Sequence, residues 1–248
     1  MHSPNASGTA AAATAAPLTV TQCACSLAPL HHCLSLFAAV KGYYDQTWQQ
    51  RAAPSGTNLG VAFGGWADVD QALADAQQVY NNLVGSKYLD IGGGDSNGRW
   101  TSNSITKLNN GLGKIKSAGY VGVCYDIEEG DAGLSTAFAN SFAKAKAAGL
   151  KVLVTISHSQ PYGFSDAATI MNTMFASASV DYVSPQLYTS GGETANDWTV
   201  DGGAIGWRSY ASSKGKIVPS VVKASMYANA QSTFQSYGVT TAGYITWA

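Results

Sequence analysis

Charge is scarce in this sequence of 248 residues. Asp, Glu, Lys and Arg make up 12% of it, the formal net charge is -1, and Lys and Arg occur singly rather than in runs. A nucleic-acid-binding protein needs a basic patch to neutralise phosphates, so that class is excluded and a neutral partner is expected. Long apolar runs are also absent, and no stretch has the length needed to span a bilayer.

Cysteine is rare as well, and three of the four cysteines crowd into one N-terminal stretch. Together with two histidines, that stretch holds Cys23, Cys25, His31, His32 and Cys33. The spacing matches no standard zinc site, so a disulfide from Cys23 or Cys25 to Cys33 is the favoured alternative if the chain is exported. The remaining cysteine would then be a single buried thiol.

The first 37 residues differ in composition from the rest of the chain. Residues 1–17 are small and polar without a periodic apolar face, and the stretch after them lacks the basic start of a secretory signal. We expect residues 1–37 to be a low-complexity or leader segment, or an arm that mediates self-assembly. Residues 38–248 are long enough for one large α/β core.

Strand-like and helix-like stretches alternate from residue 38 onward. The predicted strands are 38–44, 58–63, 87–91, 120–129, 151–156, 180–187, 216–222 and 243–247. The predicted helices are 68–83, 104–116, 136–148, 167–176, 204–212 and 229–237. Several strands are apolar on both faces, which is typical of a parallel sheet. Eight strands that alternate with helices predict a single-domain (β/α)8 TIM barrel. A doubly wound open sheet is the alternative, weakened because no Gly-x-Gly-x-x-Gly follows the first strand.

The fourth strand ends in two carboxylates, and the rest of the chain is organised around it. Residues i and i+2 of a strand share a face, so Cys124, Asp126 and Glu128 point to one side of the sheet. Two like charges this close repel, which pushes one of them to keep its proton and provides an acid and a base together. The alternative is that both acids only cap the loop at 129–133 and pair with nearby Lys.

Active sites of TIM barrels lie at the C-terminal ends of the strands, so the residues there are candidates. They form a cup of carboxylate, amide, phenol and indole that suits a sugar, without a set of ligands for a metal ion and with no cofactor expected. Tyr43, Tyr44, Trp66 and Trp100 are aromatic platforms of which only some should be exposed. His158 is expected to be a hydrogen-bonded structural residue rather than a substrate contact.

The fourth strand resembles that of glycoside hydrolase family 18, the chitinase and endo-β-N-acetylglucosaminidase group. The family pattern Asp-x-x-Asp-x-Asp-x-Glu falls on Val121, Cys124, Asp126 and Glu128, so the last two acids match and the first two do not.

Three further motifs resemble the same family, in the same order along the chain. The third-strand pattern Ser-x-Gly-Gly falls on residues 90–93, with Asp90 in place of Ser and both glycines present. Gln186 followed two residues on by Tyr188 matches the sixth strand, and Trp247 matches the tryptophan of the last strand. The resemblance therefore spans residues 38–248.

The resemblance implies hydrolysis of β-1,4-linked N-acetylglucosamine polymers with retention of configuration, the substrate's own acetamido group acting as nucleophile. It implies a carbohydrate partner and secretion. The implied roles are general acid for Glu128, orientation of the acetamido group for Asp126 and a hydrogen bond to its carbonyl for Tyr188. Gln186 and Trp247 would add substrate contacts by the same resemblance. Asp90, Tyr44 and Trp66 are further candidates for substrate binding from their places at the strand ends.

The departure at Cys124 leaves a second function open. A neutral thiol is a weak hydrogen-bond donor and cannot share a proton as a carboxyl group does. Asp90, on the neighbouring strand, is our hypothesis for the source of the missing carboxyl. Without it, the chain would be a catalytically weak or inactive carbohydrate-binding or structural protein on the same barrel, although the presence of Glu128 favours the enzyme.

Overall fold

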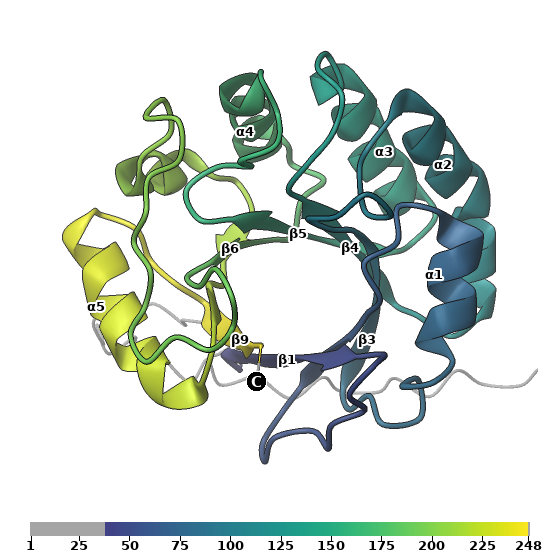
Figure 1. The fold of residues 1–248 in the computed structure, drawn as a ribbon, viewed down its shortest axis with the longest axis horizontal. Coiled ribbons are helices and arrows are strands. Elements are labelled where there is room, and N and C mark those ends of the chain that lie inside the picture. Colours follow the sequence, from purple (N-terminus) through teal and green to yellow (C-terminus); the bar gives the residue numbers. More distant parts are fainter. Residues whose placement is uncertain (1–37, 248) are drawn as a thin grey trace, which may run out of the picture. The chain divides into compact units, whose positions relative to one another are not determined.

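The computed structural model describes residues 38–247, which form a closed barrel of parallel strands (Figure 1). The predictions for residues 1–37, including the cysteine and histidine cluster, lie outside the described residues. The sheet order is β5-β4-β3-β2-β1-β9-β8-β6-β7, and pairing of β5 with β6 closes the ring. This closure confirms the predicted (β/α)8 TIM barrel and excludes the doubly wound sheet, which would have two open edges.

The strands occur close to the predicted positions. Their bounds are β1 (Val40–Gln46), β2 (Leu59–Phe63), β3 (Ser86–Gly92), β4 (Gly122–Ile127), β5 (Lys151–Ser157), β6 (Tyr182–Gln186), β7 (Lys216–Ile217), β8 (Ser220–Val221) and β9 (Gly243–Thr246). β7 and β8 are two halves of the barrel strand that was predicted as one. Pro219 lies between them and has no N–H to give to the sheet, so the ladder is interrupted there.

Helices cover the outside of the barrel after most of the strands. Their bounds are α1 (Val69–Ala76), α2 (Ser102–Ser117), α3 (Ser135–Ala147), α4 (Ala167–Ala176) and α5 (Tyr227–Ser236), with short 3-10 turns η1 (Trp207–Ser212) and η2 (Ala224–Met226). The prediction of a helix reaching residue 83 was wrong, because backbone bonds beyond Ala76 include the tighter i to i-3 type. The helix predicted at 204–212 is η1, where Trp207 and Tyr210 stack at the three-residue spacing of a 3-10 turn.

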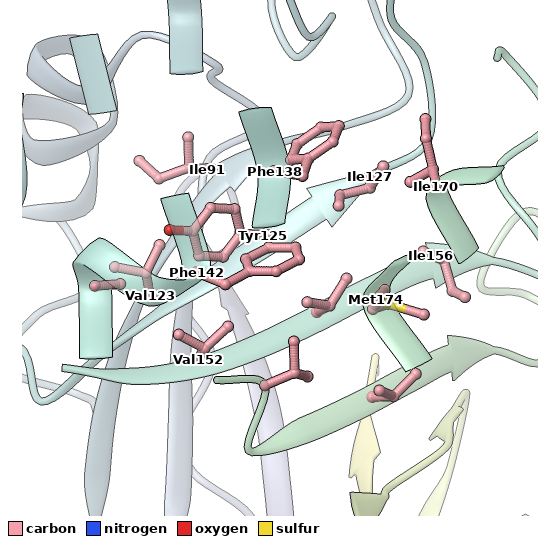
Figure 2. Packing of buried hydrophobic residues seen from close by; sticks show 14 of the residues in the cluster. Ile91, Val123, Tyr125, Ile127, Phe138, Phe142, Val152, Ile156, Ile170 and Met174 are labelled. Atoms are coloured by element: carbon pink, nitrogen blue, oxygen red, sulfur yellow. The ribbon is translucent and has the colours of Figure 1, made fainter. Parts of the chain in front are cut away.

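The strands bury both of their faces, as the apolar runs predicted. On β4, Val123, Tyr125 and Ile127 face outward and pack against helix side chains such as Phe138 and Phe142 of α3 (Figure 2). The alternate residue Cys124 faces the barrel interior. It lies there among a second group of buried side chains, which includes Tyr44, Val61, Tyr88, Leu153 and Val218. This alternation fixes which side chains of β4 reach the interior.

Within the described part of the chain, no helix has the length and apolar character required to cross a membrane.

Candidate active site

Two acids and an amide meet where β4 and β6 end. Asp126 is the last interior residue of β4 and is fully buried, whereas Glu128 follows the strand and is partly exposed. The Gln186 side-chain amide donates to Glu128 Oε1 at 2.7 Å and lies 3.3 Å from Asp126 Oδ1. No Lys or Arg of residues 38–247 forms an ion pair with either acid, so the surface-pairing alternative is not supported.

Burial raises the pKa of both acids. The pKa of Asp126 is well above its usual range because the side chain is buried and the charges of Glu128 and Asp90 repel its own. The pKa of Glu128 is also raised by burial, but the hydrogen bond from Gln186 offsets part of that effect. The pair is thus arranged to hold a proton between two carboxyl groups, which is the chemistry of an acid and a base.

Glycines after β3 allow the backbone to approach these acids closely. Gly92 and Gly93 have φ values of 108° and 146°, in the region that favours glycine. A Cβ on Gly94 would overlap with a carboxylate oxygen of Glu128. The indole N–H of Trp100 donates to the carbonyl oxygen of Asp126 at 2.7 Å and holds the end of β4 in place. The glycines therefore let the backbone after β3 pass close to the acids.

An aromatic cavity of about 260 Å³ opens above the acids. Glu128 and Gln186 reach it, and Tyr188, Trp247 and Trp48 are among its aromatic lining residues. The rings of Tyr188 and Trp247 lie 5.6 Å apart at 30°. The volume of the cavity is slightly below the range of about 300–1,000 Å³ typical of small-molecule sites. Apolar ring faces beside carboxyl and amide groups match the two sides of a sugar unit.

Two candidates lie beneath the cavity rather than on it. Tyr44 is buried in the barrel, and its hydroxyl group lies 3.0 Å from Ser220 Oγ. Asp90 of β3 is also buried, and its register partner on β4 is Cys124. Neither is among the cavity-lining residues, so neither touches a ligand held there as the structure stands.

The other predicted aromatic platforms do not line the cavity either. Trp66 is partly buried and packs against the outer core, while Tyr43 and Trp100 are buried within that core. Of the four rings, only Trp66 keeps part of its surface exposed, because the other three are turned into the core or the barrel interior.

The comparisons with known proteins bear on the fold. No family model matches the chain, and no curated protein matches its sequence. Among solved structures, one described as the copper homeostasis protein CutC from Streptococcus agalactiae is similar with a TM-score of 0.51 and 10% identity, over 85% of this chain and 99% of that chain. A chitinase from Chromobacterium violaceum has a TM-score of 0.46 and 16% identity, over 74% of this chain and 68% of its own.

A third similar structure is YKL-39, solved in the presence of chitooligosaccharides, with a TM-score of 0.44 and 12% identity over 74% of this chain and 66% of that chain. This chain spans about two thirds of the length of the chitinase structures. At 10% identity, the likeness to the CutC structure supports the barrel architecture alone, and that architecture hosts many unrelated activities.

Two exposed aromatic side chains at this end of the barrel were missed by the sequence analysis. Trp48, in the loop after β1, is 58% exposed and packs edge-on against Phe63 at 5.8 Å. Tyr162, in the loop after β5, is 52% exposed. Its hydroxyl group donates to Glu129 Oε1 at 2.6 Å and lies 3.0 Å from the carbonyl oxygen of Gly94. Their position directly after strands was a usable signal, but their exposure depends on loop paths.

His158 links two loops at the rim, in line with its predicted structural role. Its Nδ1 lies 3.1 Å from Asp201 Oδ2, and its Nε2 lies 3.1 Å from Thr189 Oγ1 and 3.2 Å from Asp197 Oδ2. Its φ of 43° is unusual for a residue other than glycine, and these contacts hold it there. Among residues 38–247, no group of three or more His, Cys, Asp or Glu side chains is arranged to hold a metal ion.

Proposed function

We propose that this chain is a glycoside hydrolase that cleaves β-1,4-linked N-acetylglucosamine polymers by a retaining, substrate-assisted mechanism. The observation that carries the proposal is the graded burial of two adjacent acids under an aromatic cavity. Glu128 reaches the cavity, Asp126 lies one step deeper, and Gln186 contacts both. Secretion, which the family resemblance implies, belongs to the same proposal.

The residues divide the work according to their depth. Glu128 is the carboxyl that a bound sugar can reach, so it gives its proton to the leaving oxygen and later takes one from water. Asp126 is buried and orients the acetamido group of the substrate. It stabilises the positive charge that develops when the acetamido oxygen closes a ring onto the sugar. The hydroxyl group of Tyr188 is buried and has no well-formed hydrogen bond to residues 38–247, so it can donate to the acetamido carbonyl. Trp247 provides the apolar floor.

Release of a chromophore from a chitotrioside tests this proposal. Glu128→Gln keeps the shape of the side chain but has no proton to give, so kcat is expected to fall by about 10²–10⁴-fold. Asp131→Asn is the matched control, because Asp131 lies on the surface in an ion pair with Arg99 and should turn over like wild type. Equal rates for the Glu128 variant and wild type would refute the role of Glu128.

A binding protein without turnover is the second candidate, favoured by one contact. The 2.7 Å hydrogen bond from the Gln186 amide stabilises the charged form of Glu128 and works against its holding a proton. Calorimetric titration with chitotriose separates the two functions. Heat of binding without product release would support the second candidate, whereas product release that depends on Glu128 supports the enzyme.

A further inference from the structure

Asp90 occupies a position that packing alone does not explain. It is 1% exposed and points into the barrel from β3. Its register partner on β4 is Cys124, whose thiol lies beside it. No well-formed hydrogen bond from residues 38–247 reaches either of its carboxyl oxygens. A buried carboxyl without good partners destabilises the fold, and the neighbouring interior positions hold apolar residues such as Val61 and Leu153. Costs of this kind occur mostly at functional sites.

The geometry points to a positioning role for Asp90: together with the Cys124 thiol, it controls how many protons Asp126 and Glu128 share and thereby keeps Glu128 supplied with the proton it donates. Gly92, two residues after Asp90, is the register partner of Asp126, so the two aspartates are diagonal neighbours on adjacent strands. The three acids thus form a row from the barrel interior to the cavity. The proposal rests on the proposed function for its kinetic test only.

Like-charge repulsion couples the members of this row. The charge of Glu128 raises the pKa of Asp90 in addition to the larger effect of burial, and the charge of Asp90 raises that of Asp126. Three carboxylates this close cannot all ionise together, so their protons are released as a set. The other titratable groups that act on the row or on the thiol are Tyr44 of β1, Tyr88 of β3, Glu129 after β4, His158 and Tyr162 after β5, and Tyr188 after β6.

No basic side chain among the described residues forms an ion pair with the row. The weakly donating thiol of Cys124 offsets only part of the effect of burial on the pKa of Asp90. Asp90 therefore holds its proton in competition with its two neighbours, and a change in its charge is felt at Glu128.

Kinetics of four variants provide the first arm of the test. In Asp90→Asn one of three mutually repelling charges is removed, so the remaining acids release protons more readily. We expect the alkaline limb of the pH profile of kcat/KM to move to lower pH and kcat to fall by about tenfold or more, with KM changed by less than about twofold. Asp90→Ser should behave alike. The double variant Asp90→Ser with Cys124→Asp moves the carboxyl group from β3 to β4. It should return the alkaline limb of kcat/KM and the value of kcat to those of wild type.

Asp70→Asn is the fourth variant and the matched control, since Asp70 lies on α1 in an exposed ion pair with Lys114. If Asp90 serves only in folding, its substitution would lower the stability and kcat without moving the alkaline limb of kcat/KM. Adding Cys124→Asp would then not restore the kcat of Asp90→Ser. If Asp90→Ser does not fold, the Asn variant and the double variant still decide the question.

Carbon-13 NMR of the carboxyl groups provides the second arm, which needs no turnover. We expect Asp126 and Glu128 to titrate at lower pH in Asp90→Asn than in wild type, and to be unchanged in Asp70→Asn. If wild type releases no product but these titrations move, the glycosidase proposal fails and the coupling stands. If wild type is active but neither the pH limb nor the titrations respond to Asp90→Asn, the positioning role is overturned and the glycosidase proposal remains.

Discussion

At the scale of single residues, depth in the barrel distinguishes side chains of the same chemical type. Asp126 and Glu128 are two residues apart and face the same side, yet only Glu128 reaches the cavity. Burial is the largest cause of the raised pKa of each acid, and only the shallower one can be reached by a ligand in the cavity. The same rule separates aromatic residues. Tyr44 is buried and packs, whereas Trp48 is exposed and can contact a ligand.

Trp48→Ala tests the contribution of that exposed ring to binding. Affinity for chitotriose is expected to weaken by about threefold to tenfold, because one aromatic contact is worth about 0.5–1.5 kcal/mol. The melting temperature should stay near that of wild type, since the indole is mostly exposed. Calorimetric titration measures the first effect and thermal unfolding the second. Val84→Ala, an exposed apolar change just before β3, should leave the affinity unchanged; an equal loss there would rule out a specific role for Trp48.

At the scale of elements, α2 shows how one helix can hold two glycines with opposite effects on stability. Both Gly111 and Gly113 carry the entropic disadvantage of glycine in a helix. Gly111 is buried, and a Cβ placed on it would lie 2.8 Å from Cγ1 of Val69 on α1. A Cβ on Gly113 would meet nothing within 4 Å. Only the first glycine is therefore needed, because it lets α1 and α2 approach each other.

Replacement of each glycine by alanine should change stability in opposite directions. Gly113→Ala is expected to raise the free energy of unfolding by about 0.5–1 kcal/mol through helix propensity. Gly111→Ala should lower it by about 1–3 kcal/mol through overpacking against Val69. Urea denaturation of the two variants and wild type measures both effects. Stabilisation by both substitutions would show that the contact between α1 and α2 yields easily.

Sequence periodicity predicted the strands well because both of their faces are buried, so each reads as a short apolar run. The same periodicity placed Asp126 and Glu128 on one face at the end of β4, where the structure has them. It could not show the register that sets Asp90 opposite Cys124, because pairing across strands depends on the closed sheet. Nor could it show the exposure of Trp48 and Tyr162, which depends on how two loops run.

At the scale of the whole molecule, the described barrel carries two opposite responses to pH. Four donor contacts, from the backbone N–H groups of Thr189 and Ser190, a further backbone amide and the Ser190 hydroxyl group, lower the pKa of Glu193 to about 2 despite partial burial. The Glu193 carboxylate stabilises the fold at pH values above 4.5, the pKa of this group in the unfolded chain. The contribution is lost as the pH falls toward 2. The buried acids in the barrel act in the opposite sense.

The pKa of Asp126 is higher in the folded chain than its unfolded value of 3.8, so its contribution to stability is complete below 3.8 and is lost as pH rises toward the folded value. Asp126→Asn cannot ionise and removes this loss. The free energy of unfolding of wild type, relative to this variant, should therefore fall as pH rises from about 5 to 8, with a slope of at most about 1.4 kcal/mol per pH unit. Urea denaturation in this range measures it, because the contribution of Glu193 is already complete there. A constant difference across the range would mean that Asp126 ionises as freely inside the barrel as in the unfolded chain.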